Sequence, residues 1–250
     1  MEYLLTLNDL SKLDSRINGV IIGNSKFAVR LVKSFDLDII DSIEKDIYIS
    51  VNKIFHMSEL KELERYLIEV KKKNVKGIFF SDLGVYQICK RLNLTDKLIY
   101  DPITLIVNKM ELLYFENKIK GIVVSPFISI ENLKEFKSDK LELYFLGNGR
   151  IPLLYSKRPL LTNYAKYHDM EEDFIFNKLY IKEELRESIF PIIQDENGTH
   201  VFSPYIFSSL GFRLDNIDKL IIDLVYDNEF IKGDNEGFLN RKIVYKKERI

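Results

Sequence analysis

The chain has 250 residues, of which 46% are apolar and 12% aromatic, enough to bury a core in one large domain or two small ones. Charged residues make up 30% and the formal net charge is -1, which excludes a global attraction to nucleic acid or membranes but leaves local basic patches open. The single cysteine, Cys89, excludes an internal disulfide and cannot by itself form a Cys-rich metal or iron–sulfur site.

The N-terminal sequence lacks the basic segment, long apolar segment and small-residue cleavage site of a secretory signal peptide. No apolar run approaches the roughly 18 residues that a membrane helix needs. Together with the lone cysteine, these features predict a cytoplasmic protein without a membrane partner.

Short apolar runs recur along the chain and predict strands. Most are continuously apolar rather than alternating, which is typical of parallel strands buried on both faces. The first seven runs are Glu2–Leu7, 19–23, 46–51, 76–80, 97–100, 121–124 and 141–146, and Lys219–Leu224 predicts an eighth strand.

Helices or loops separate these strands. The clearest helix is Ser58–Lys73, in which Ser58 is a good N-cap, acidic residues occupy the first turn and lysines occupy the last. Its apolar stripe consists of Leu60, Leu63, Leu67 and Val70. Shorter helices are predicted after Asn8 and at 84–92, 108–115 and 129–136.

The stretch Tyr144–Tyr164 follows the seventh strand and predicts a sharp turn at Gly147–Gly149. Beyond Tyr164 the pattern changes to antiparallel pairing, with runs at 179–183, 190–194 and 200–203 and an Asn-Gly hairpin turn at 196–198. Further predictions are helical residues around 206–210, a short helix or loop at 227–231 and an edge strand at 242–246.

Eight strand–helix units in 250 residues predict an α/β fold, a TIM-type (β/α)8 barrel. We expect a single barrel domain over 1–250, with a small antiparallel hairpin insertion at about 176–204 before the last strand. A doubly wound open sheet is the alternative, and the lack of a glycine-rich phosphate loop after the first strand disfavours it.

Polar residues directly follow most predicted strands, and in a TIM barrel the functional residues lie at strand ends. Each residue alone is as well explained by helix capping or turn formation, so the prediction of a site on one rim is collective. These residues are Asn24, Asn52, Asp82, Asp101, Ser125 and Asn148.

Candidate nucleophiles are weakly supported by their surroundings. Ser156 adjoins Lys157, but neighbours on a strand point to opposite faces, and the sequence contains no nucleophile elbow. Cys89 lies between apolar neighbours, which indicates a buried structural thiol.

The histidines His56, His168 and His200 show no metal-ligand spacing. No metal site and no cofactor are predicted. A divalent metal is left open, and His200 with Asp195 is the pair that would hold it.

A basic and aromatic cluster follows the glycine-rich turn. Arginine and lysine suit carboxylate or phosphate groups, and interleaved tyrosines could stack on the bases of a single-stranded nucleic acid or hold a peptide terminus. A solvated basic loop explains the cluster equally well. Pro152 and Pro159 stiffen the segment, which contains Arg150, Tyr155, Lys157, Arg158, Tyr164, Lys166 and Tyr167.

Several segments in the same order resemble the collagenase-like peptidases, family 32 of unassigned catalytic type. The resemblance includes an early strand followed by aromatic-x-x-Arg, a strand that ends in Asn before a helix, a strand–Asp-x-Gly–helix unit and a Tyr-Ser-x-Arg–Leu-Leu-x-Asn signature. The corresponding segments are 19–30, 49–67, 75–92, 99–115, 144–164 and 195–210.

The chain departs from this pattern in its cysteines. Many members of the family have His-Gly and then Cys where this chain has Leu146-Gly147, and members with an iron–sulfur cluster use several downstream cysteines. The resemblance therefore implies a short branch without an iron–sulfur cluster.

The resemblance implies a peptidase that hydrolyses peptide bonds by an unassigned mechanism. The alternative is a non-proteolytic barrel that binds RNA or a partner as an accessory to tRNA or rRNA base modification, with a longer member of the same family as partner. The catalytic candidates are Asp82, Ser156 and Arg158. The substrate-binding candidates are Asn52, Asp101, Asn108, Tyr155, Lys157, Arg158 and Asn163.

Overall fold

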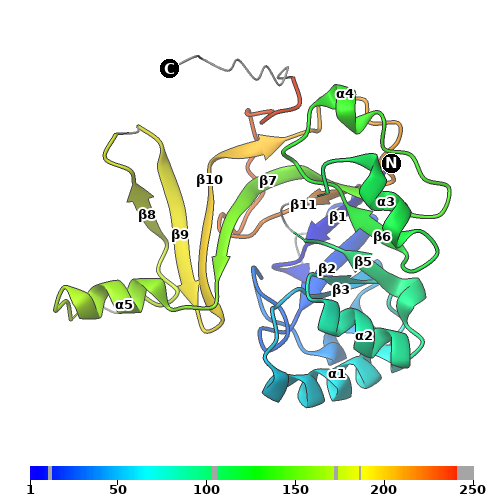
Figure 1. Ribbon diagram of the computed structural model, residues 1–250, viewed down its shortest axis with the longest axis horizontal. Helices are drawn as coiled ribbons and strands as arrows, with labels where there is room; N and C mark the ends of the chain where they lie inside the picture. The colour runs from blue at the N-terminus through cyan, green and yellow to red at the C-terminus, as the bar shows by residue number, and fades with distance from the viewer. Residues whose placement is uncertain (11–12, 103–105, 172–173, 186, 241–250) are drawn as a thin grey trace.

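The computed structural model describes residues 1–10, 13–102, 106–171, 174–185 and 187–240 (Figure 1). Its centre is a closed barrel of eight parallel strands, which confirms the predicted TIM-type architecture. The last strand closes the barrel by pairing with both the first and the seventh. The barrel strands are β1 (Glu2–Thr6), β2 (Gly19–Gly23), β3 (Asp46–Val51), β4 (Gly77–Phe80), β5 (Leu98–Tyr100), β6 (Gly121–Val123), β7 (Glu142–Ser156) and β11 (Lys219–Ile222).

Side chains fill the interior of the barrel. Tyr48, Phe79 and Tyr144 form the aromatic part of this filling, with ring centroids of Phe79 and Tyr144 5.5 Å apart. Each remaining strand adds one aliphatic side chain, so the interior is a packed core rather than a channel. The aliphatic members are Leu4, Ile21, Ile99, Val123 and Ile221.

Helices cover part of the outer wall (Figure 1). They are α1 (Leu60–Lys72), α2 (Leu83–Arg91), α3 (Lys109–Phe115) and α4 (Ile130–Leu133), with 3-10 turns η2 (Leu37–Ser42), η3 (Met57–Glu59) and η4 (Thr95–Lys97). Leu63, Leu67 and Val70 of α1 are buried as predicted. No helix in the described part of the chain is long and apolar enough to cross a membrane.

The predicted N-cap at Ser58 is wrong, because the helical segment starts earlier. The turn η3 begins after His56, whose backbone N–H donates to the Glu59 carboxylate over 2.6 Å. This capping box starts the segment two residues before Ser58. The helix predicted after Asn8 includes residues 11 and 12, which lie outside the described residues.

The predicted turn at Gly147–Gly149 is also wrong, because these residues lie within β7, a single strand of 15 residues. A β-bulge replaces the turn: Leu146 pairs with Ile221 and Asn148 with Ile222, which leaves Gly147 as the extra residue. Beyond the bulge β7 leaves the barrel and continues as an antiparallel strand.

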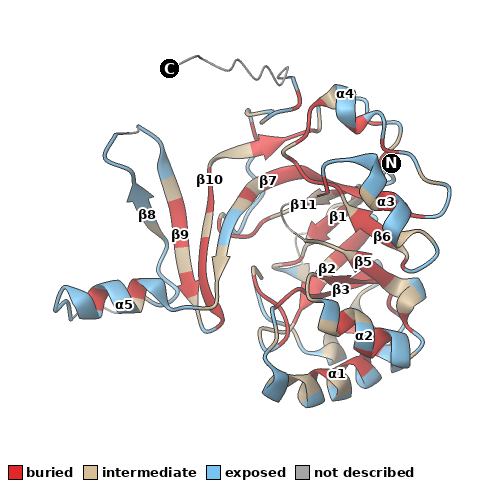
Figure 2. Ribbon diagram, in the orientation of Figure 1, coloured by how far each residue is buried: buried red, intermediate tan, exposed pale blue. Residues whose placement is uncertain are grey.

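An antiparallel extension is built on this second half of β7. It adds β10 (Gly198–Ser208), β9 (Ile189–Asp195) and β8 (Leu179–Lys182) in that spatial order, and α5 (Leu160–Tyr167) connects β7 to the rest (Figure 1). The predicted hairpin turn near Asn197 joins β9 and β10. Figure 2 shows that β10 is largely buried and β9 partly so, whereas α5 and β8 are largely exposed.

One further prediction differs from the structure. Residues 206–208 continue β10 rather than forming a helix, because Ile206, Phe207 and Ser208 pair with Arg150, Gly149 and Asn148. Residues 227–231 form turns and loop, which is one of the two possibilities that the sequence left open. The edge strand predicted at 242–246 lies outside the described residues.

Candidate functional site at the barrel mouth

The carboxyl ends of the barrel strands surround a small cavity of about 100 Å³. Its floor is apolar, with Phe79 and Ile221 from the barrel core. Polar groups converge above this floor from several different strand ends, as in TIM-barrel sites. They include Thr6, Arg30, Ser50, Asn52, Asp101 and Asp223.

Arg30 is the main cation at the mouth. Its side chain is only 8% exposed, and Nη2 lies 3.5 Å from Asp101 Oδ2. Its Nε is buried and makes no hydrogen bond within the described structure. The backbone of Arg30 has φ of 56°, a left-handed conformation that is uncommon for a residue of this kind. A buried guanidinium with an unpaired N–H is suited to donate a hydrogen bond to a ligand oxygen.

Asp223 is the half-buried acid beside this cation. Burial raises the pKa of its carboxyl, against the opposing effects of the Val225 N–H, the Arg30 charge and the Thr6 hydroxyl. The Val225 N–H donates to Oδ1 over 2.9 Å and the Thr6 hydroxyl over 3.3 Å. The mouth therefore places a carboxyl of raised pKa beside a buried cation.

Two of the predicted rim residues, Asn52 and Asp101, line this cavity. Asn52 is buried and its Oδ1 accepts the Val29 N–H over 2.9 Å, which fixes the loop that carries Arg30. Asp101 makes the ion pair with Arg30. The rim prediction thus placed these two residues at one opening.

Other predicted residues organise loops. Asp82 caps α2, with Oδ1 accepting the Gly84 N–H over 2.7 Å and Oδ2 accepting the Phe55 N–H over 2.9 Å. Asn108 caps α3 by accepting the Met110 N–H over 3.1 Å. These contacts account for both side chains as helix caps.

The basic segment after β7 is partly tied down. Lys157 Nζ donates to the Ile54 carbonyl over 2.8 Å and lies 3.2 Å from Glu59 Oε2, while Lys53 pairs with the other Glu59 oxygen at 2.8 Å. Burial alone would raise the pKa of Glu59, but hydrogen bonds from Lys53, the His56 backbone and Lys157 lower it to about 2. Lys157 therefore joins the extension to the barrel rim.

The remaining predicted residues lie on the extension, away from the mouth cavity. Ser156 Oγ accepts the Arg158 N–H over 3.2 Å in a local turn. Arg158 and Asn163 are exposed at the start of α5. Tyr155 stacks on His200 with ring centroids 4.8 Å apart. The structure thus divides the predicted site residues among the barrel mouth, two helix caps and the extension.

A second cavity of about 330 Å³ adjoins the mouth and shares the segment 30–33 with it. It contains the predicted pair His200 and Asp195, whose Nε2 and Oδ2 atoms are 3.5 Å apart. That distance is long for a hydrogen bond. Among the described residues, no third histidine, cysteine or acid joins them as a metal cluster.

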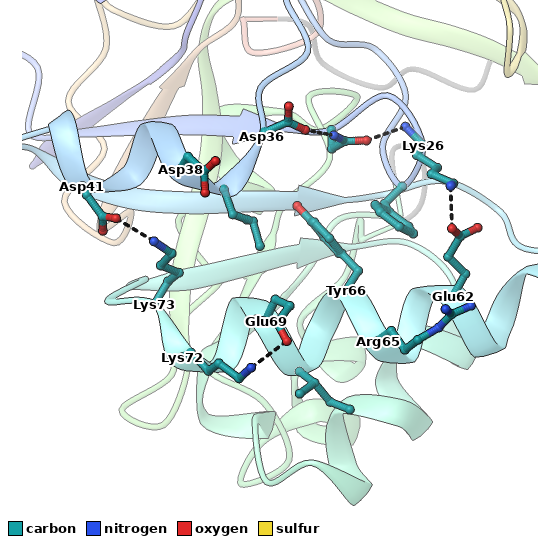
Figure 3. A pocket seen from close by; sticks show the side chains of 14 residues that line it. Lys26, Asp36, Asp38, Asp41, Glu62, Arg65, Tyr66, Glu69, Lys72 and Lys73 are labelled. Atoms are coloured by element: carbon teal, nitrogen blue, oxygen red, sulfur yellow. Dashed lines mark hydrogen bonds and ion pairs between the residues drawn. The ribbon is translucent and has the colours of Figure 1, made fainter.

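A larger hollow of about 890 Å³ lies outside the barrel, between η2 and α1 (Figure 3). Most of its charges form ion pairs: Lys73 Nζ lies 2.7 Å from Asp41, and Lys72 lies 2.7 Å from Glu69. Tyr66 stacks on Phe27 along its wall. Because most of these side chains are paired at the surface, the mouth, where polar groups converge, is the stronger candidate.

The prediction missed Arg30 and Asp223 as site residues. Arg30 ends the family-like segment 19–30, so its aromatic-x-x-Arg pattern was the available signal. Asp223 directly follows β11, but the predicted strand ran to Leu224 and so concealed a polar residue at a strand end.

Comparisons with known proteins agree with this architecture. The sequence model of Peptidase family U32 matches residues 10–221. The Bacillus subtilis tRNA hydroxylation protein P2 is 25% identical over 212 residues, which cover 80% of this chain and 69% of that protein. The solved structure of the U32 peptidase Mk0906 superimposes with a TM-score of 0.55 and 16% identity, over 88% of this chain and 91% of that one.

Proposed function

We propose that this chain, which belongs to peptidase family U32, is an RNA-binding barrel protein that serves tRNA base modification. The similarity to a protein named for tRNA hydroxylation supports this choice among the functions open to the family. The structural observation that carries it is an aromatic and basic surface on α5.

This surface, the α5 platform, consists of Arg158, Tyr164, Lys166, Tyr167 and His168. Tyr167 is 83% exposed and Tyr164 is 55% exposed. The His168 ring lies 4.5 Å from the Tyr164 ring and 5.0 Å from the Tyr167 ring. Exposed rings beside cations are the usual platform for unpaired bases, and each stacked base contributes about 1–3 kcal/mol.

Filter binding of tRNA at increasing salt tests the proposal. We expect affinity to fall as salt rises from about 50 to 200 mM, because phosphate contacts release counterions. Replacing both Tyr164 and Tyr167 by Ala should weaken binding at least tenfold. Leu185→Ala is the matched control, since Leu185 is 93% exposed but lies outside α5. No binding, a flat salt response, or equal affinities of the double variant and the control would remove the proposal.

A longer member of the same family is the partner that we propose for the chemical step. The support is the single cysteine of this chain, since an iron–sulfur cluster needs several cysteine ligands, which a partner would have to supply. Affinity purification of the tagged chain from its own cells, followed by mass spectrometry, should recover that relative in stoichiometric amount. Recovery of the chain alone would argue against the partnership.

Peptide hydrolysis is the second candidate function. The observation that favours it is the buried His200 beside Asp195, a pairing found in general-base catalysis. Incubation of the pure protein with a broad peptide library, with and without divalent metals, tests whether it hydrolyses peptide bonds. Cleavage that is lost in His200→Gln would support hydrolysis, and the absence of cleavage under all conditions would remove it.

A further inference from the structure

We propose that the second cavity, between the segment 25–34 and the antiparallel extension, is a binding pocket for a single nucleobase extruded from RNA. This inference rests on the proposed RNA-binding function and names the group that this part of the protein takes. Its volume of about 330 Å³ falls in the range of about 300–1,000 Å³ typical of small-molecule sites.

The walls of the pocket suit a flat ring. Phe202 and Tyr226 are buried and lie 5.7 Å apart, centroid to centroid, while Phe176 is 61% exposed at the edge. Val32 and Ile193 pack against the two buried rings. Aromatic and aliphatic walls of this kind stack on any base, because every base has a π-face.

Two buried polar side chains at the pocket have ring or guanidinium nitrogens without hydrogen-bond partners in the described structure. His200 is 1% exposed, and neither of its ring nitrogens makes a hydrogen bond in the described structure. The same holds for Arg30 Nε, and Arg30 lines this pocket as well as the mouth. Unpaired buried polar groups are unfavourable, so a ligand that offers both a donor and an acceptor is favoured. The edge of a nucleobase offers both.

The charges favour a neutral ring over an anion. Arg30 is already paired with Asp101, and the lining acids Asp195 and Glu196 disfavour an anion in the inner part of the pocket. Lys33 and Lys178 also line the pocket. These two cations are suited to the phosphates that flank an extruded base.

Unusual backbone conformations concentrate at this pocket. Seven described non-glycine residues have positive φ, and four of them line it: Arg30, Phe176, Tyr226 and Asn228. Such conformations cluster at ligand sites, where the surrounding structure maintains the strain. The other three are Asn or Asp residues just after helix ends, a common location for this conformation; they are Asn93, Asn117 and Asp169.

The pocket is rigidly connected to the α5 platform. Gln194 Oε1 accepts the Leu161 N–H over 2.9 Å, and Thr199 Oγ1 accepts the Leu160 N–H over 3.0 Å. Gln194 and Thr199 directly precede Asp195 and His200 in the chain. RNA held on α5 is therefore held at a fixed position relative to the pocket.

Histidine-selective NMR tests the inference, because the chain has three histidines and His56 and His168 are exposed. Titration with uridine, cytidine, adenosine and guanosine should shift the His200 resonance and leave that of His56 in place. Phe176→Ala should weaken nucleoside binding about tenfold through lost stacking, and Leu185→Ala should not. Phe176 is exposed, so its replacement leaves the core intact.

The outcomes separate the pocket from the proposed function. If no nucleoside shifts His200 while tRNA still binds the α5 platform, the pocket inference is wrong and the proposed function stands. If nucleosides shift His200 but tRNA does not bind, the pocket stands and the RNA function falls. An equal shift of His200 by inorganic phosphate alone would show an anion site and overturn the inference.

Discussion

Gly149 lies where β7 leaves the barrel, and we expect Gly149→Ala to destabilise the protein strongly. Its φ of +144° lies in a region that residues with a side chain rarely adopt. An added Cβ would lie 2.6 Å from the Asp223 carbonyl oxygen and 2.8 Å from Asp223 Cβ. These atoms belong to Asp223, the residue directly after β11. They cannot move aside without displacing β11 from its pairing with β7, which closes the barrel.

The magnitude follows from two effects. Forcing the backbone conformation costs about 1–3 kcal/mol, and overpacking costs about 1–3 kcal/mol. Together they amount to roughly 2–6 kcal/mol, against a total stability of about 5–15 kcal/mol for a typical domain. For a chain of this size each kcal/mol lowers the Tm by roughly 2–4 °C.

Urea unfolding followed by far-UV circular dichroism measures the effect. Gly211→Ala is the matched control, because a Cβ there meets nothing within 4 Å. We expect the control to lie within about 0.5 kcal/mol of the native protein. If the free energies of unfolding of the two variants agree within that margin, the close approach of Gly149 to Asp223 does not limit the residue at this position.

Two further predictions concern neighbouring features. Asn148→Ala should cost about 2–4 kcal/mol in urea unfolding, because its buried amide donates to the Ile231 carbonyl and accepts the Gly233 N–H; a loss no larger than that of the exposed Asn163→Ala would contradict this. Glu59→Gln should be less stable than the native protein at pH 7. Because the folded pKa is about 2 and the ordinary value 4.5, that difference should shrink as pH falls below about 5 and vanish near pH 2; a constant difference would refute it.

Much of the barrel could be predicted because its signals are local. Gly19–Gly23 and Gly77–Phe80 are continuous apolar runs that only a strand buried on both faces needs. The side chain of Asp82, which follows β4, caps α2, and that of Asn108 caps α3 at the start of the predicted helix 108–115. The cap at Asp82 explains why position at a strand end alone is a weak indicator of a functional site.

The site could be predicted only in part because it depends on contacts far apart in the chain. Arg30 meets Asp101 across 71 residues, and Asn197 Nδ2 donates to the Ser25 carbonyl across 172 residues. No local pattern marks such a pair. The basic segment after β7 illustrates the limit, since Lys157 is an anion-binding candidate in the sequence and an ion-pair partner of Glu59 in the structure.

The amino-acid sequence by itself determined the barrel, because continuous apolar runs followed in turn by capped helices can be recognised within short windows of sequence. The tertiary structure alone decided the path of residues 144–164. Gly147 and Gly149 suit a turn as well as a bulge, and the choice depends on β11 and β10, which come more than 40 residues later. Their pairing carries β7 out of the barrel and forms the wall that unites Arg30, Asp195 and His200 around one pocket.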